Sequence, residues 1–294
     1  MNATPWTLYA AVALLAWLVA MFGTPLCRRL AQRFDIVDRP SEARKIHHTA
    51  IPYLGGLPFY GAFLAMAALV IAWRPELADR AFYPMAALGG IVMLMGLLDD
   101  IIGLSSALKL VIELIIGITL YYWGIGEGGF SQPFAGLFHI GWLAPIIAAL
   151  WVAGVMNAVN FSDGMDGLAG GLVFISAATL FAIGVKNGQT ASCLVMACLM
   201  GCTLGFLFFN SHPASIFMGD AGALFLGFAL AGATLSVQQK GAAVLAMIVP
   251  MTALAVVFSR KISAVMIRMM IGLMLQITYA LAMVVLLTAV NKEK

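Results

Sequence analysis

Long apolar runs, interrupted by short polar segments, make up most of this chain. A helix needs about 20 residues to cross the hydrocarbon core of a membrane, and apolar runs of about that length recur along the sequence. They lie near residues 6–26, 52–72, 82–98, 107–123, 142–159, 168–185, 190–209, 221–237, 241–258 and 264–290. Strands of a membrane barrel are only about 10 residues long and alternate in polarity. The pattern therefore predicts an all-α fold, a polytopic integral membrane bundle of about ten transmembrane helices.

The composition is that of a membrane protein. The chain has 294 residues, of which 63% are hydrophobic and 10% are charged, whereas a soluble domain carries about 25% charged residues. No linker or low-complexity tract divides the sequence. We therefore expect a single transmembrane domain that covers residues 1–294.

The basic residues indicate how the bundle lies in the membrane. No Lys or Arg precedes the first apolar run, and Arg28, Arg29 and Arg33 follow it. Lys and Arg concentrate in cytoplasmic loops, so we expect the N-terminus outside and, after ten spans, the C-terminus outside as well. The cytoplasmic loops are then expected near residues 27–51, 99–106, 157–167 and 210–220.

Five aspartates lie where apolar runs meet polar segments, beside Gly or Asn. They are Asp99, Asp100, Asp163, Asp166 and Asp220. Carboxylates this close to hydrocarbon are rare and usually functional, and under the expected topology all five face the cytoplasm. Mg²⁺ is typically held by one or two carboxylates together with substrate phosphates. The pattern therefore indicates a metal and phosphate site at the cytoplasmic face.

Two asparagines on the same side extend this candidate site. Together with two of the aspartates they recur every three positions, a spacing that keeps the four residues on one face of a helical turn: Asn157, Asn160, Asp163 and Asp166. Gly164 and Gly167 favour a break in that segment. Lys109, near the start of the fourth run, is a candidate phosphate contact. The basic segment from 28 to 48 suits a phosphate or lipid head group, and no basic domain indicates a nucleic-acid partner.

Each of these features also has an ordinary structural explanation. Asp99 and Asp100 could solvate the end of a helix, and Asp220 could be the N-cap of the eighth helix. Lys109 could extend to the interface, or pair with Glu113 one turn deeper, which otherwise faces the cavity. A common site is the favoured interpretation, because all these groups share one face.

Four motifs, in this order, are similar to those of one membrane enzyme family. They are Asp38–His47 with Pro52–Gly56, Gly96–Asp100 with Lys109, Asn157–Leu168, and Phe217–Gly222. In these segments the chain resembles the polyprenyl-phosphate N-acetylhexosamine-1-phosphate transferases, a group that includes phospho-MurNAc-pentapeptide translocase. The sugar-nucleotide branch is more similar than the pentapeptide branch, chiefly in Arg44-Lys45 and in residues 157–167.

The resemblance implies an enzyme that transfers a sugar-1-phosphate from a UDP-sugar to a polyprenyl phosphate and releases UMP. GlcNAc-1-phosphate is the default sugar. The reaction would be the first membrane step of cell-envelope glycan assembly, in cell-wall or lipopolysaccharide biosynthesis. The implied location is the inner (cytoplasmic) membrane, with the active site facing the cytoplasm. The implied partners are the UDP-sugar, the lipid phosphate, the membrane and, as a further candidate, a second copy of the chain in a homodimer.

The resemblance also implies which acids do the chemistry. Asp220 is implied as a ligand of Mg²⁺, for which Mn²⁺ is an alternative, and Asn160 as a second ligand. Asp99 and Asp100 are implied as the pair near the lipid phosphate, with one of them acting as base. This is physically reasonable, because phosphoryl transfer depends mainly on positioning and on neutralisation of charge.

The remaining implied roles concern nucleotide and substrate binding. Asp163 and Asp166 are implied in nucleotide or catalytic roles. Substrate binding is implied for Lys45, His47, Lys109 and Asn157.

One part of the sequence departs from the family pattern. After the ninth span the family carries an Asp, an Arg pair and a long loop ending in a His-x-His-His motif, which helps to hold the nucleotide-sugar. Here residues 250–261 pass directly into the next apolar run without that motif. Two alternatives to an active transferase therefore stay open. One is a catalytically impaired relative that binds lipid phosphate; the other is a transporter, although transporters usually place coupling residues near the midplane of repeated halves.

Overall fold

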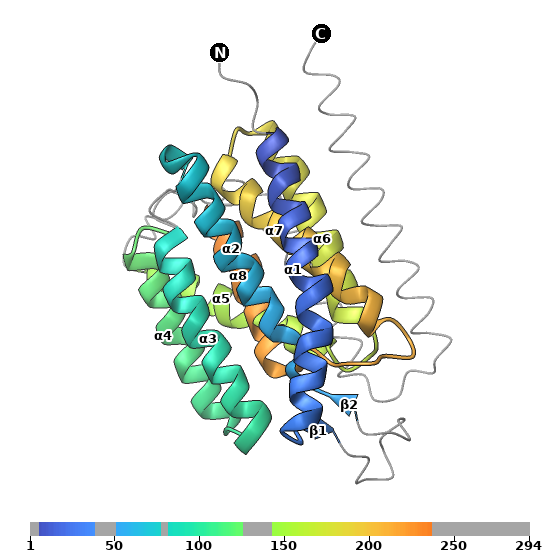
Figure 1. Ribbon diagram of the computed structural model, residues 1–294. Helices are drawn as coiled ribbons and strands as arrows, with labels where there is room; N and C mark the ends of the chain where they lie inside the picture. Colours follow the sequence, from blue (N-terminus) through green and yellow to red (C-terminus); the bar gives the residue numbers. More distant parts are fainter. Residues whose placement is uncertain (1–5, 39–50, 78–81, 126–142, 237–294) are drawn as a thin grey trace, which may run out of the picture.

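The computed structural model describes residues 6–38, 51–77, 82–125 and 143–236, which form a bundle of helices (Figure 1). The α-helices are α1 (Trp6–Arg33), α2 (Leu57–Trp73), α3 (Phe82–Ile102), α4 (Ser106–Tyr122), α5 (Ala144–Ser162), α6 (Leu168–Lys186), α7 (Thr190–Asn210) and α8 (Gly219–Ser236). Two short antiparallel strands, β1 (Val37–Asp38) and β2 (Ile51–Pro52), and two 3₁₀ turns, η1 (Leu54–Gly56) and η2 (Pro75–Leu77), lie between helices.

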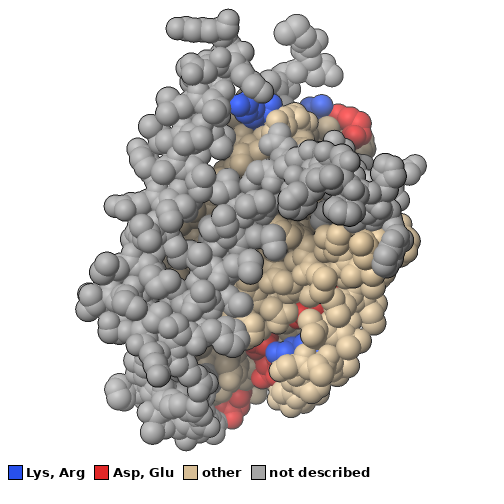
Figure 2. All heavy atoms as spheres, turned by 180° about the vertical axis from the view of Figure 1, so that it is seen from behind, with Lys and Arg blue, Asp and Glu red and all other residues tan. Residues whose placement is uncertain are grey.

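The prediction of a helical membrane bundle is confirmed for the part of the chain that the structure describes. Each of the first eight apolar runs forms a helix, and six of these helices are long and apolar enough to cross a membrane. Figure 2 shows one face of the molecule, on which the charged atoms lie toward the two ends and an uncharged band separates them. The protein is therefore a multi-pass membrane protein. The predicted ninth and tenth spans and both termini lie outside the described residues.

Several helices extend beyond the apolar runs that predict them. The first helix continues to Arg33, and α3 continues to Ile102, so that the Asp99-Asp100 pair is helical rather than part of a loop. Likewise α5 includes Asn157 and Asn160 and ends at Ser162. The predicted break in that segment is confirmed as a tight turn, in which Gly167 has a φ of +73° that favours glycine.

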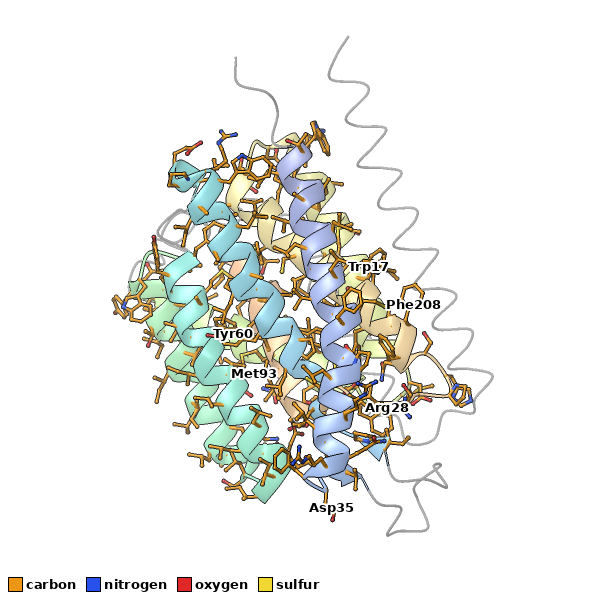
Figure 3. The ribbon with its side chains drawn as sticks, in the orientation of Figure 1. Trp17, Arg28, Asp35, Tyr60, Met93 and Phe208 are labelled. Atoms are coloured by element: carbon orange, nitrogen blue, oxygen red, sulfur yellow. The ribbon has the colours of Figure 1, made fainter. Side chains whose placement is uncertain are left out.

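The central helix of the bundle is α8, and small residues let other helices approach it closely. A methyl group on Gly96 of α3 would lie 2.3 Å from the Ala221 Cα, and one on Gly56 would lie 2.2 Å from the Gly222 Cα. In a bilayer, such small residues allow the van der Waals packing that holds helices together. A polar contact supports the neighbouring α2–α3 pair, since the Tyr60 hydroxyl donates to the Ala86 carbonyl oxygen over 3.0 Å (Figure 3).

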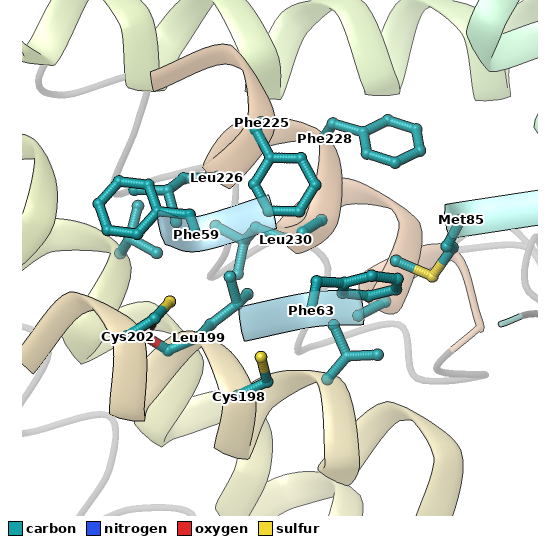
Figure 4. Close-up of a cluster of buried hydrophobic side chains, with 14 of the residues drawn as sticks. Phe59, Phe63, Met85, Cys198, Leu199, Cys202, Phe225, Leu226, Phe228 and Leu230 are labelled. Carbon is teal, nitrogen blue, oxygen red and sulfur yellow. Dashed lines mark hydrogen bonds between the residues drawn. The ribbon is translucent and has the colours of Figure 1, made fainter. Parts of the chain in front are cut away.

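Aromatic side chains from α2 and α8 fill the space between the helices. Figure 4 shows this cluster, in which the ring centroid of Phe63 on α2 lies 6.0 Å from that of Phe225 on α8. Cys198 and Cys202 of α7 lie at its edge as buried free thiols. Because α8 is buried along nearly its whole length, its first turn is held in a fixed position relative to α2, α3 and α5.

We expect Gly96→Ala to lower the melting temperature of the protein in detergent. The added methyl group must push α3 away from the backbone of α8, and overpacking of this kind costs about 1–3 kcal/mol. The matched control is Gly154→Ala in α5, where a methyl group meets no atom within 4 Å and Ala is the better helix former. Equal melting temperatures for the two variants would contradict the close α3–α8 contact.

Candidate active site

The five aspartates lie at helix ends or in the adjoining turns at one end of the bundle, which we call the acidic end. Figure 1 shows β1, β2 and the α3–α4 and α7–α8 connections at this end. Backbone bonds join two of the predicted loops there: the Phe217 N–H donates to the Pro52 carbonyl over 2.8 Å, and the Gly55 N–H donates to the Phe217 carbonyl over 3.0 Å. Arg28, near the end of α1, lies at the same end (Figure 3). These contacts bring the connection before α2 and the connection before α8 together at the acidic end.

The ammonium of Lys109, on α4, connects one acid of α3 to one acid of α8. The Lys109 Nζ donates to an oxygen of Asp99, and it also donates to Asp220 Oδ2 over 2.9 Å. The Asn160 Nδ2 lies 3.3 Å from the same Asp220 oxygen. We call Asp99, Lys109, Asn160 and Asp220 the Lys109 cluster. It joins α3, α4, α5 and α8, whose residues lie far apart in the sequence.

The Lys109 cluster is partly open to solvent. The side chains are 10% exposed for Asp99, 18% for Lys109 and 30% for Asp220. A charged group buried on all sides would be closed to ligands, whereas this graded exposure leaves one side of the cluster accessible. The cluster is therefore accessible to a ligand from that side.

Asp100 faces away from Lys109 and binds the start of α8. Its two oxygens accept the N–H of Asp220 over 2.8 Å and the N–H of Ala221 over 3.2 Å. These N–H groups belong to the first turn of α8, where a helix has unpaired donors and favours negative charge. Gly219 makes room for the carboxylate, because a methyl group there would lie 2.6 Å from Asp100 Oδ2. Of the predicted acidic pair, only Asp99 points into the Lys109 cluster.

Asp163 and Asp166 lie in the turn between α5 and α6, beside the Lys109 cluster. Asp163 is the C-cap of α5, beyond the membrane-spanning part of that helix. Burial raises its pKa well above the ordinary value of 3.8, and the charges of Asp220, Asp100 and Asp166 raise it further. Asp163 is therefore close enough to the cluster to interact with it electrostatically.

Asp166 anchors the connection between α7 and α8. Its Oδ2 lies 2.8 Å from His212 Nδ1 and accepts the Ala214 N–H over 3.1 Å. Asn210 supports the same region by accepting the Gly167 N–H and donating to the Ile216 carbonyl, each over 3.0 Å. The sequence analysis assigns no role to Asn210 or His212. Their position in the sequence, at the end of the seventh apolar run and shortly before the Phe217–Gly222 motif, could have pointed to them.

Asn157 lies in a deeper layer than the Lys109 cluster. Its Nδ2 donates to Glu113 and, over 2.9 Å, to the Ala153 carbonyl. Glu113 does not pair with Lys109 in this structure, contrary to the prediction, because the Lys109 ammonium binds Asp99 and Asp220 instead. Asn157 points toward a buried side chain, whereas its predicted role is substrate binding. Lys45 and His47, the other predicted substrate contacts, lie outside the described residues.

The oxygen atoms at the acidic end suit a hard cation such as Mg²⁺. Among the described residues, no group of three or more His, Cys, Asp and Glu is arranged as a ready-made metal site. Mg²⁺ seldom has such a site, since it usually takes one or two carboxylates, waters and substrate phosphates. Asp220 has two carboxylate oxygens, and Asn160 beside it has a carboxamide oxygen in addition to the Nδ2 that faces Asp220. The ammonium of Lys109 shows that a positive charge fits between Asp99 and Asp220. The residues present therefore fit the ion.

The structure defines a multi-pass helical membrane protein with a partly exposed, oxygen-rich site at one end. Residues 82–238, just over half of the chain, match the family model described as glycosyl transferase family 4. The chain therefore belongs to this family of transferases, and the resemblance inferred from the four motifs is confirmed.

Individual relatives agree with this assignment. A probable undecaprenyl-phosphate N-acetylglucosaminyl 1-phosphate transferase of Bacillus subtilis is 34% identical over 81% of this chain and 66% of its own length. A phospho-N-acetylmuramoyl-pentapeptide-transferase of Streptococcus pneumoniae is 31% identical over 76% of the chain and 72% of its own. A decaprenyl-phosphate N-acetylglucosaminephosphotransferase of Mycolicibacterium smegmatis is 33% identical over 76% of the chain and 59% of its own. The chain thus spans roughly two thirds of the length of these relatives.

We expect Asp100→Asn to loosen the first turn of α8. An amide can accept through only one of its two terminal atoms, so one N–H of α8 would face an NH₂ group, and a lost buried bond costs about 1–3 kcal/mol. The measurement is hydrogen exchange of the Asp220 and Ala221 amides, together with the melting temperature. Glu76→Gln, an exposed carboxylate-to-amide change in η2, is the control. Unchanged exchange at both amides would refute the role of Asp100.

We expect Asp163→Asn to change how stability depends on pH. The folded pKa of Asp163 lies above 3.8, so its contribution to stability is fully present below that value and is lost as the pH rises through the folded pKa. The variant cannot ionise. The melting temperature of the variant should therefore be close to that of the wild type at about pH 4, and a few degrees above it at about pH 8. Melting curves with a chelator present check this, and a difference that does not vary with pH would contradict it.

Proposed function

We propose that this protein transfers a sugar-1-phosphate, with GlcNAc-1-phosphate as the first candidate, from a UDP-sugar to a polyprenyl phosphate and releases UMP. The observation that carries the proposal is the Lys109 cluster, in which one ammonium binds both Asp99, 10 positions away, and Asp220, 111 positions away. Phosphoryl transfer requires positioned phosphates and neutralised charge. The names of the Bacillus subtilis and Mycolicibacterium smegmatis relatives, which refer to undecaprenyl and decaprenyl phosphate, support the same reaction.

In the proposed reaction, an oxygen of the lipid phosphate attacks the sugar-bearing phosphorus of the donor. A new P–O bond forms, and the bond from that phosphorus to the bridging oxygen breaks. UMP leaves with the bridging oxygen and its electron pair, while the sugar keeps its bond to phosphate. Any proton on the attacking phosphate passes to Asp99, because Asp99 faces Lys109 whereas Asp100 is bonded to the backbone of α8.

The residues of the Lys109 cluster bind and orient the phosphates. Lys109 neutralises phosphate charge in a partly buried site, where electrostatic interactions are stronger than in water. Asp220 and Asn160 are the residues that would hold Mg²⁺, or Mn²⁺ in its place. The ion, when bound, supplies positive charge that the single ammonium cannot provide alone. Asp100 contributes indirectly, since it fixes the turn of α8 that carries Asp220.

The two substrates would approach the site from different directions. The polyprenyl chain is apolar and would lie in the membrane beside the helices, with its phosphate at the acidic end. The UDP-sugar comes from water and would meet the exposed α5–α6 turn and the α7–α8 connection, where Asp163, Asp166 and His212 lie. In this proposal the acidic end faces the cytoplasm and the protein lies in the inner membrane.

The test is release of UMP by purified protein given undecaprenyl phosphate, a panel of UDP-N-acetylhexosamines and Mg²⁺. We expect release that needs both substrates and stops when a chelator removes the metal. Asp220→Asn should reduce turnover by at least about 10³-fold, a loss comparable to removing one strong electrostatic contact to the transition state. Glu76→Gln is the control and should keep full turnover.

Three outcomes separate the alternatives. Undiminished turnover in Asp220→Asn would remove the metal assignment. No release with any donor, from protein shown to be folded and to bind polyprenyl phosphate, would favour the impaired relative. Uptake of a solute into vesicles in place of UMP release would favour a transporter.

A further inference from the structure

Glu113 is a buried carboxylate to which the proposed reaction gives no role. It lies on α4, four residues after Lys109, and is 1% exposed. One of its oxygens accepts a hydrogen bond from Asn157 Nδ2, whereas its Oε1 is buried and has no hydrogen-bond partner in the described residues. A buried carboxylate oxygen without a donor is strongly unfavourable. Glu113 therefore has one acceptor available for a further donor.

Lys109 has the complementary property. An ammonium has three N–H donors, and the described contacts of Lys109 are to Asp99 and Asp220. Residues four apart on a helix lie on the same face, one turn from each other. Among the described residues, Lys109 and Asp220 lie close enough for their charges to act on Glu113. The spare acceptor of Glu113 therefore lies on the same face of α4 as Lys109, one turn deeper in the bundle.

The surroundings keep Glu113 fixed while Lys109 can move. Asn157 holds one Glu113 oxygen and is itself tied to the Ala153 carbonyl of α5. The two helices are in close contact one turn further along, where a methyl group on Gly117 would lie 2.5 Å from the Ala149 Cα. Lys109 in contrast has a long flexible side chain and is partly exposed. A fixed acceptor thus lies below a mobile donor.

We propose that Glu113 is a positioning residue, which accepts a hydrogen bond from the Lys109 ammonium when Asp220 binds a cation. This inference rests on the proposed function, because that function brings a cation and phosphates to the Lys109 cluster. While Asp220 is bound to the ion, Glu113 keeps Lys109 paired with an anion and directed at the lipid phosphate beside Asp99. Asn157 then acts through Glu113, which explains why its amide points into the bundle.

The first test measures melting temperature and needs no turnover. Glu113→Gln keeps the acceptor for Asn157 and removes only the charge, so it should shift the melting temperature little in the otherwise native chain. In an Asp220→Asn background, Lys109 keeps Asp99 but loses its second carboxylate partner, whose place Glu113 would take, so the same change should lower the melting temperature by several degrees more. Adding Lys109→Gln should abolish that difference. Equal effects of Glu113→Gln in all three backgrounds would overturn the proposal.

The second test separates positioning from a purely structural role. Glu113→Gln is expected to raise the KM for polyprenyl phosphate about tenfold, within the range of coupling between contacting groups, and to leave the KM for the UDP-sugar unchanged. In a Lys109→Gln background it should have no further effect on turnover. Glu76→Gln, the same chemical change in η2, is the control. Equal losses with and without Lys109 would refute the role of Glu113.

The two tests also distinguish this inference from the proposed function. Unequal melting shifts in a protein that releases no UMP would support the link between Glu113 and Lys109 and count against the transferase. Normal release of UMP with equal melting shifts would overturn the role of Glu113 and leave the transferase standing.

Discussion

The bonds from the Lys109 ammonium to Asp99 and Asp220 are the interaction on which the acidic end depends. Two carboxylates so close to hydrocarbon repel each other and lose hydration, and a shared cation offsets both effects. The same ammonium holds α4 against α3 and α8 at the point where the chain must stay open to substrates. One interaction therefore serves both the assembly of the bundle and the chemistry of the site.

The helices could be predicted from sequence because a membrane leaves few alternatives for an apolar run of about 20 residues. Their ends could not be predicted in the same way. A helix continues past its apolar run wherever other groups satisfy its polar residues, and here Asp99 extends α3 because it finds Lys109 and the Leu104 N–H. Such partners belong to other elements, so the apolar and polar residues around a helix end do not reveal them.

The candidate site shows the same limit. The clustering of the aspartates at one end followed from topology, and the three-residue spacing placed Asn157 and Asn160 on one side of a helix. The hydrogen-bond partners of these residues could not be predicted from the same spacing. Asp100 binds backbone groups 120 residues away, and Asn157 selects Glu113 on another helix. Those contacts depend on how α4, α5 and α8 pack, which is set by glycine and alanine positions such as Gly117 and Ala149.

The central place of α8 has a consequence for how the protein is made. Chain order delivers the α3–α4 pair to the membrane early, so that Asp99 and Lys109 can join as neighbours ten residues apart. Asp220 arrives only with α8, the last of the described helices, which must enter between elements already inserted. Until then Asp100 has no helix terminus to bind. The Lys109 cluster is therefore complete only once α8 has packed at the centre of the bundle, although half of it can form much earlier.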